Sequence, residues 1–258
     1  MNSSDFRKEA REKLSGKWGK SALIAFIYVC ISSIISLISQ KMGESPISIL
    51  MLILEYLITI PLAYGLTDSY IKIFDNKEVS AFDFIPAGFN NFSRSWGVTL
   101  NVLLKMLLPI VLLILSIVIF IAGGLSTFIF SSASANINNT ASSFGAVFII
   151  GLILYIASIV LLITWSYYYQ LSQIIAIDNP DLTTKEAVMK SKEYMTGNRW
   201  KLFCLEFSFI GWAFLAAFTL GIGYFWVMPY MLVSQVSFAR FVYGKNKNET
   251  PIEINENN

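Results

Sequence analysis

The sequence lacks histidine entirely and contains only two cysteines among 258 residues. Without histidine, neither a Ser-His-Asp nor a Cys-His catalytic site can form, and no histidine can ligate zinc or haem. Cys30 and Cys204 both lie in apolar segments, which argues against a disulfide framework or a CxxC metal site. We interpret both cysteines as small buried apolar residues and expect no cofactor and no metal.

Charged residues are scarce as well, at 14%, whereas hydrophobic residues make up 55% of the chain. Soluble domains carry about 25% charged residues. A chain of this size cannot enclose so much apolar surface in one core and still cover its exterior with polar side chains. The net charge of +2 is far from the basic excess of a nucleic-acid-binding protein. The composition therefore excludes a soluble, a disordered and a nucleic-acid-binding protein, and it indicates a polytopic membrane protein.

Six segments are long and apolar enough to cross a membrane, which takes about 20 residues. We expect an all-α membrane protein with six transmembrane helices at residues 21–39, 47–71, 98–121, 146–177, 202–222 and 224–243. Only the Gly-rich turn at residues 220–223 separates the last two, which predicts a tight helical hairpin. The first segment is too long for a cleaved signal peptide, and no small-residue cleavage site follows it.

The orientation follows from the distribution of positive charge. Seventeen of the 19 Lys and Arg residues lie in the N-terminal arm, the second and fourth connections, and the C-terminal end. The positive-inside rule then places both termini in the cytoplasm, as expected for a multi-pass protein of the cell (plasma) membrane. The external connection at residues 123–145 has no charge and is predicted to be a flexible polar linker.

The three cytoplasmic segments each combine apolar residues at helical spacing with a following span. The apolar stripes are Phe6, Ala10, Leu14 and Trp18; then Phe82, Ile85, Phe89, Phe92 and Trp96; then Ala187, Val188, Ser191, Tyr194 and Met195. Capping boxes begin the second stripe, at Ser80–Asp83, and the third, at Thr183–Glu186, but not the first.

Short motifs recur with these stripes. Phe74-Asp75-Asn76 precedes the second stripe, and Ile177-Asp178-Asn179 precedes the third. We therefore predict three repeat units, each an interfacial amphipathic helix plus a transmembrane hairpin. They comprise residues 1–74, 75–177 and 178–244, followed by a disordered cytoplasmic tail at residues 245–258.

In each unit the apolar stripe is expected to lie in the headgroup boundary, with Lys and Arg directed at anionic lipid phosphates. The expected interfacial anchors are Trp18, Trp96 and Trp200, because tryptophan favours the interface, with Gly16 and Gly197 at the bends between helix and span. Two interpretations stay open. The helices either anchor the bundle and carry the topology signal, or they sense or reshape lipid.

Three ionisable residues, Glu55, Lys105 and Glu206, lie within predicted spans, where charge is costly and marks candidate functional positions. Lys105 and Glu206 occupy early turns of equivalent helices and could pair, and Lys105 could also reach the interface by snorkelling. Glu55 lies in the outer half of its span and is the most isolated. These intramembrane polar candidates fit structural pairing, a polar pathway, or snorkelling without a role.

Several short segments carry a resemblance to a known family. They are Arg11–Trp18, Met195–Gly197, Ser208–Trp212, Thr219–Gly223 and Pro229–Tyr230. The sequence resembles, over nearly its whole length, a bacterial membrane protein family catalogued as domain of unknown function 975. It is also distantly similar to the membrane domain fused to some glycerophosphodiester phosphodiesterases, although the catalytic domain of those enzymes has no counterpart here. The resemblance implies no activity and no catalytic residues.

We therefore expect a protein that is not an enzyme and that organises the membrane or responds to envelope stress. Its expected partners are membrane lipids, and a membrane protein stays open as a second partner. The alternative is a small-molecule or peptide transporter, an exporter or a bacteriocin-immunity protein that works through Glu55, Lys105 and Glu206. A lipid-modifying enzyme would need an acid–base pair that the sequence does not show.

Overall fold

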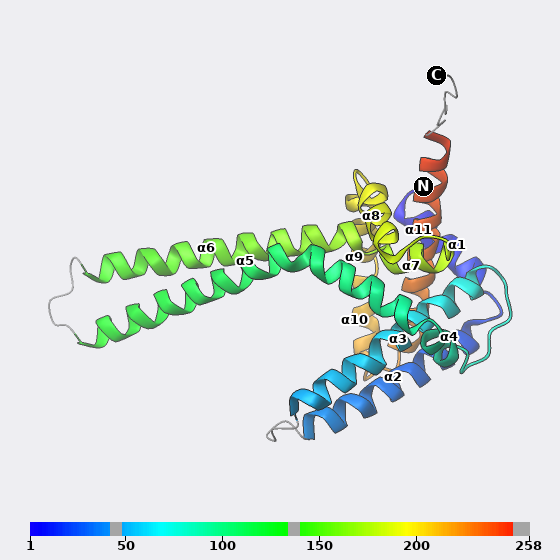
Figure 1. The fold of residues 1–258 in the computed structure, drawn as a ribbon, viewed down its shortest axis with the longest axis horizontal. Helices are drawn as coiled ribbons and strands as arrows, with labels where there is room; N and C mark the ends of the chain where they lie inside the picture. The colour runs from blue at the N-terminus through cyan, green and yellow to red at the C-terminus, as the bar shows by residue number, and fades with distance from the viewer. Residues whose placement is uncertain (42–47, 134–139, 250–258) are drawn as a thin grey trace. The chain divides into compact units, whose positions relative to one another are not determined.

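The computed structural model describes residues 1–41, 48–133 and 140–249, and every regular element within them is a helix. The helices are α1 (Ser3–Leu14), α2 (Trp18–Lys41), α3 (Ser48–Phe74), α4 (Phe84–Asn90), α5 (Phe92–Ala133), α6 (Thr140–Tyr169), α7 (Ser172–Asp178), α8 (Thr184–Met195), α9 (Arg199–Phe207), α10 (Ile210–Phe218) and α11 (Tyr224–Glu249). The all-α prediction is confirmed for this part of the chain (Figure 1).

Five helical stretches are long and apolar enough to cross a membrane. They are Trp18–Lys41, Ser48–Phe74, Phe92–Ser126, Ala146–Asp178 and Arg199–Phe218. The chain is thus a multi-pass membrane protein. The sixth span at residues 224–243, which would lie in the more polar α11, stays a prediction, as do the orientation of the termini and the three repeat units.

Three predicted segments differ from the observed helices. The fourth predicted span is interrupted, because α6 ends at Tyr169 and α7 begins only at Ser172. The fifth is divided into α9 and α10 at residues 208–209. The predicted linker at residues 123–145 is partly wrong, since the backbone is helical up to Ala133 and again from Thr140, and the remaining residues 134–139 lie outside the described part of the chain.

The ends of the chain allow a similar comparison. Helix α11 continues through Glu249 and so extends into the region predicted as a disordered tail, whose residues 250–258 the structure does not describe. The Gly-rich turn is where the sequence places it. Leu220 and Gly221 have φ of 55° and 89°, and the Gly223 amide donates to the Thr219 hydroxyl at 2.7 Å.

The chain divides into two compact units. One contains residues 1–101 and 170–258, and the other contains residues 102–169. The smaller unit is an antiparallel hairpin of α5 and α6 in which glycines allow the backbones to touch: a Cβ at Gly151 would lie 2.7 Å from the Phe120 Cα. The Ser116 and Ser158 hydroxyls share a hydrogen bond of 2.9 Å across the same hairpin.

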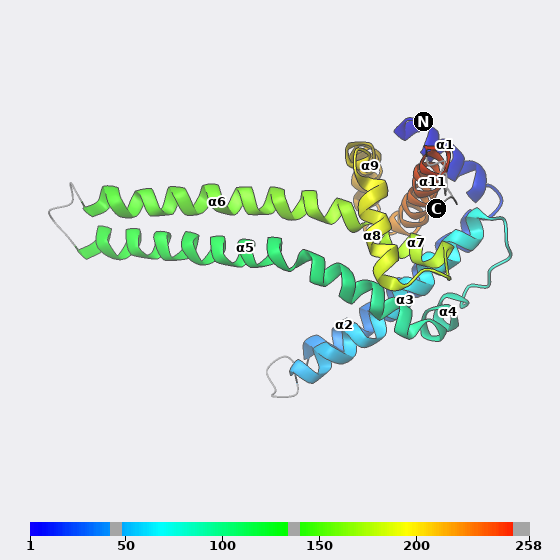
Figure 2. The ribbon, with the colours of Figure 1, turned by 45° about the horizontal axis from the view of Figure 1, so that its top comes forward.

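In the larger unit, α11 is the helix on which most of the others pack, with α1, α2 and α3 as its main neighbours. Figures 1 and 2 both show α1 alongside α11. The Phe6 ring of α1 makes edge-on contacts with Phe238 and Phe241 of α11, with centroids 5.4 and 5.5 Å apart. The first helix in the sequence is thereby packed against the last.

Helix α4 packs on α3 with close backbone contacts at two glycines. A Cβ at Gly65 would lie 1.9 Å from the Phe84 carbonyl oxygen, and a Cβ at Gly88 would lie 2.0 Å from the Pro61 carbonyl oxygen. Any other residue at Gly65 or Gly88 would therefore force the two helices apart. Phe84, fully buried beside this contact, completes the inner face of α4.

Candidate functional site

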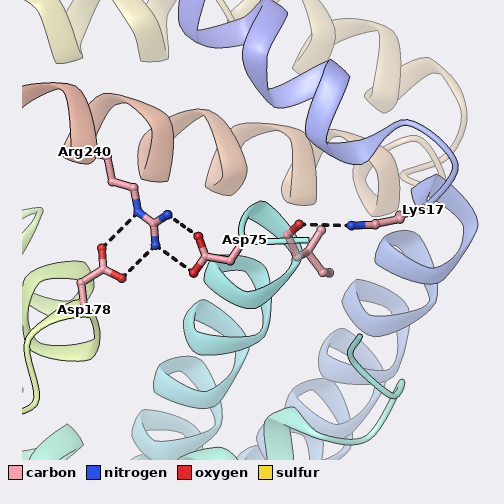
Figure 3. Close-up of polar contacts among 5 residues, drawn as sticks. Lys17, Asp75, Asp178 and Arg240 are labelled. Carbon is pink, nitrogen blue, oxygen red and sulfur yellow. Dashed lines mark hydrogen bonds and ion pairs between the residues drawn. The ribbon is translucent and has the colours of Figure 1, made fainter. Parts of the chain in front are cut away.

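The most concentrated polar arrangement in the larger unit is centred on Arg240, near the end of α11. Its guanidinium forms ion pairs with Asp75, directly after α3, and with Asp178, the last residue of α7 (Figure 3). Nη2 donates to both carboxylates at 3.1 Å, and Nη1 completes a bidentate pair with Asp75. Because a planar guanidinium holds two carboxylates in fixed geometry, Arg240 ties the ends of α3 and α7 to α11.

Helix α1 and the loop after it add further cations to this place. Lys17 donates to the Asn76 side-chain oxygen at 3.1 Å, next to Asp75. Lys13 and Arg240 both lie over the ring of Phe74, at 5.1 and 5.0 Å from its centroid. The Phe74 ring is buried, and cation–π contacts contribute about 0.5–1 kcal/mol at exposed sites and about 2 kcal/mol when desolvated. The end of α3 is thus held by groups from α1 and α11 together.

Electrostatics follow from these contacts. The hydrogen bond from Arg240 is the main cause that lowers the pKa of Asp75 below its usual range, and nearby positive charge adds to the effect. Arg94 binds the neighbouring helix end, where Nη2 donates to the Ala176 and Asn179 carbonyls at 2.9 Å. A cation at a helix C-terminus satisfies carbonyls that lack partners within the helix.

Sequence reasoning did not identify the Arg240 cluster, although two signals were present. Asp75 and Asp178 occupy equivalent places in the recurring Phe-Asp-Asn and Ile-Asp-Asn motifs. Arg240 is the one charged residue within the predicted span at residues 224–243. A lone cation in an apolar helix requires an anionic partner, and the repeated aspartates were the available pair.

The intramembrane candidates lie in three different settings. Glu206 accepts hydrogen bonds from Gln170 and from Gln235, the latter at 2.9 Å, so amides from two other segments surround this carboxylate. Glu55 is half-buried in α3 and forms no ion pair with any described residue. Lys105 is exposed and belongs to the hairpin unit, so its pairing with Glu206 stays a prediction.

The expected interfacial anchors have different surroundings. Gly16 and Gly197 have φ of 74° and 82°, the left-handed conformation that suits a bend and that glycine adopts without strain. Trp18 packs edge-on against Tyr230, with centroids 5.8 Å apart, and Trp200 is 72% exposed. The Trp96 indole nitrogen is buried without a partner among the described residues. Their roles as membrane anchors stay predictions.

The amphipathic helices correct the sequence analysis on one point. The stripes of α1 and α8 were expected to lie in lipid headgroups, yet Phe6, Ala10, Leu14, Ala187, Val188, Ser191 and Met195 are all buried inside the protein. The apolar period was correct, but the stripes of these two helices pack on protein. Of the second stripe, Phe82, Phe89 and Phe92 are exposed, whereas Ile85 and Trp96 are half-buried, and Phe84 and Gly88 form the inner face of α4.

The helix caps show a second difference. The Thr183–Glu186 capping box is confirmed, with reciprocal hydrogen bonds of 2.8 and 3.3 Å. At Ser80 only the backbone amide is bound, by Asp83 at 2.7 Å. The first helix, expected to lack a cap, has one, since the Asn2 amide donates to Asp5 at 2.8 Å. Asn and Asp substitute here for the usual Ser or Thr and Glu.

The described residues contain no group of three or more His, Cys, Asp or Glu side chains placed to hold a metal ion. The charges of the Arg240 cluster already bind one another. The chemistry of the cluster is therefore limited to charge pairing and to the binding of a charged ligand.

Comparison with known proteins gives one result. No curated protein and no solved structure matches the sequence significantly. A family model does match, over residues 1–246, and so covers nearly the whole chain. The chain therefore belongs to the family described as protein of unknown function DUF975.

Proposed function

We propose that this chain is a non-enzymatic, multi-pass protein of the bacterial cell membrane that organises the membrane or responds to envelope stress by engaging lipid. The proposal includes cytoplasmic termini, which the positive-inside pattern supports. The observation that carries it is a set of exposed phenylalanines in and beside α4. Phe82, Phe89 and Phe92 are 59%, 42% and 37% exposed, although Phe82 and Phe89 lie between two membrane-crossing helices rather than within them.

This exposure distinguishes α4 from the other two amphipathic helices, whose stripes are buried. Phe82 lies just before α4, Phe89 within it and Phe92 at the start of α5, so this short segment exposes three large apolar side chains that water does not favour. At the end of a span such a segment suits the boundary between headgroups and acyl chains, where aromatic side chains are stable. The packing of α4 on α3 through glycines supports this role, because it frees the aromatic side chains for lipid.

Spin labelling in vesicles tests the proposal. A nitroxide is attached at Phe89→Cys in a variant whose Cys30 and Cys204 are replaced by alanine. Labels at Leu104, on the exposed surface of α5, and at exposed Glu78 serve as lipid and water controls. We expect the Phe89 label to be accessible to oxygen and protected from a water-soluble nickel complex, as at Leu104. Accessibility like that at Glu78 would contradict lipid contact at α4.

A functional readout complements this measurement. A polarity-sensitive membrane dye reports lipid order in vesicles with and without the reconstituted protein. The change in lipid order that the protein causes should be smaller for Phe82→Ser plus Phe89→Ser than for the wild type. Leu125→Ser plus Phe128→Ser, on the exposed surface of α5, is the matched control for loss of apolar area. An equal loss of effect in both double variants would mean that α4 has no special role.

One observation favours the alternative of a transporter or exporter. The fifth apolar stretch is broken at residues 208–209, next to Glu206 with its two glutamine partners. Discontinuous helices beside polar groups are a recurrent feature of transporters. If Glu206→Gln abolished a transport or resistance phenotype at unchanged protein abundance, while Glu55→Gln did not, this alternative would replace the lipid-organising one.

A further inference from the structure

A cavity of about 570 Å³ lies beside the Arg240 cluster, where the ends of α3 and α7 meet the C-terminal half of α11, and against α8. Two apolar stretches of the chain end at its wall, at Phe74 and at Asp178. The cavity is therefore placed at the boundary between the membrane and the charged side of the protein. Its volume is within the range of small-molecule sites, roughly 300–1,000 Å³.

Some of the charged side chains in the cavity wall form ion pairs with one another. Its ionisable residues, tyrosines aside, are Asp68, Lys72, Asp75, Lys77, Asp178, Lys190 and Arg240. The three carboxylates already have cationic partners, because Lys72 pairs with Asp68 at 2.7 Å and Arg240 pairs with the other two. With four cationic and three anionic side chains, the cavity wall has a net charge of +1.

Two cations in this wall have no such partner. Lys77 and Lys190 form no ion pair with any described residue. Glu186, one turn before Lys190 on α8, accepts hydrogen bonds from the amide and hydroxyl of Thr183. Those bonds are the main cause that lowers the pKa of Glu186, and Lys190 contributes only weakly. Both ammonium groups are therefore available to an anion in the cavity.

A neutral donor completes the set. Tyr243 lines the cavity, and its hydroxyl oxygen is buried behind the cavity surface without a hydrogen-bond partner within the described residues. The ring of Tyr194 packs against that of Tyr243, with centroids 5.2 Å apart, and restricts its orientation. A buried hydroxyl without a partner is costly, and an oxygen-rich ligand would satisfy it.

We propose that this cavity binds a phosphate group, held by Lys77, Lys190 and the Tyr243 hydroxyl. A phosphate supplies both the negative charge that the two ammonium groups lack and the acceptor that the hydroxyl lacks. Basic pockets between membrane helices at the cytoplasmic side bind anionic headgroups on this principle. The phosphate comes either from a lipid headgroup or from a water-soluble phosphate ester. The inference is independent of the proposed function, because none of its residues lies on α4.

Two probes distinguish the sources. Native mass spectrometry of the full chain measures retention of phosphatidylglycerol relative to phosphatidylcholine, and a thermal shift measures binding of glycerol 1-phosphate, a water-soluble phosphate monoester. Selective retention of phosphatidylglycerol without a shift by glycerol 1-phosphate assigns the site to lipid. A shift by glycerol 1-phosphate assigns it to the soluble ester. Failure of both probes on the wild type overturns the proposal.

Variants localise the binding. Lys77→Gln plus Lys190→Gln should lower affinity for the probe that binds by about tenfold or more, because each removes a charge-assisted hydrogen bond. Lys20→Gln plus Lys185→Gln, at exposed lysines outside the cavity, is matched in charge and should leave affinity unchanged. Equal losses in both double variants would indicate general attraction between charges and overturn the site.

Tyr243→Phe keeps the test independent of folding. Removal of an unpartnered hydroxyl should leave the ligand-free protein as stable as before or more so, yet it should weaken phosphate binding by about threefold. A variant that binds the probe as well as the wild type would remove Tyr243 from the site. A variant that is less stable without the probe would show that the hydroxyl has a structural partner.

Discussion

Helix α1 and the segment around α4 differ in what their apolar side chains contact. Phe6, Ala10 and Leu14 of α1 are buried against the rest of the larger unit, chiefly α11, whereas Phe82 and Phe89 point away from the protein. The difference arises at the helix–helix contact. Helix α1 packs through side chains and needs its stripe for that purpose. Helix α4 packs through the backbones at Gly65 and Gly88 and through the buried Phe84, which leaves Phe89 on the opposite side exposed.

The largest difference should appear when each stripe is truncated. Phe6→Ala removes a fully buried ring and should destabilise the protein by about 3–5 kcal/mol. Phe89→Ala, at an exposed position, should change stability by no more than about 0.5 kcal/mol. Thermal unfolding in detergent measures both. Similar losses from the two variants would mean that α4 also depends on its aromatic face for folding.

The glycine contact gives the second effect. Gly88→Val places side-chain atoms where the Pro61 carbonyl lies and should destabilise by about 1–3 kcal/mol or more. Gly211→Val is the matched control, since no atom lies within 4 Å of a Cβ at that position. The same detergent assay applies. If Gly88→Val unfolded at the wild-type temperature, the backbone contact of α3 and α4 would not explain why the aromatic face is free.

Loss of the Arg240 cluster should give the third-largest effect. Arg240→Met leaves Asp75 and Asp178 unpaired and should cost about 1–3 kcal/mol, intermediate between exposed and buried ion pairs because the cluster is partly exposed. Hydrogen exchange should show lost protection in α1, which shares Phe74 with Arg240, and unchanged protection in α4.

A double-mutant cycle provides the control. Adding Asp75→Asn plus Asp178→Asn to Arg240→Met should restore part of the stability, because the uncompensated negative charges are removed. Additive losses would show that the three side chains do not act as one unit.

The smallest effect concerns pH. The pKa of Asp75 is lower in the folded protein than in the unfolded chain, so the unfolded state binds more protons and stability rises with pH. The contribution is complete above the unfolded pKa of about 4 and is lost as pH falls through the lower folded value. Unfolding temperatures should therefore fall below about pH 4 by less in Asp75→Asn than in the wild type. Parallel pH profiles would contradict a role for this pair.

Helical periodicity predicted these elements but not their partners. The period of Phe6, Ala10 and Leu14 is the same whether the stripe packs on lipid or on α11, so lipid contact was a wrong choice between two equivalent signals. The glycine bends at residues 16 and 197 were readable because few residues adopt a left-handed backbone. The turn at residues 220–223 was readable for the same reason.

The Arg240 cluster could not be predicted from local sequence patterns. Its members are separated by 165 and 62 residues, and only the packing of α11 between the ends of α3 and α7 brings them together. The break between α6 and α7 was also missed, although it lies within the polar and aromatic stretch at residues 165–173, because such residues are equally typical of the end of a continuous span at the membrane interface.

Arg240 also imposes an order on biosynthesis. It is made 165 residues after Asp75, which corresponds to roughly 10–30 s of translation at typical rates. Asp75 has no counter-charge from α11 during all of that interval, and Asp178 lacks one while the last 62 residues before Arg240 are made. A chain terminated before Arg240 would lack the cation that joins the two carboxylates, so this link between α3 and α7 can form only after most of α11 has been synthesised.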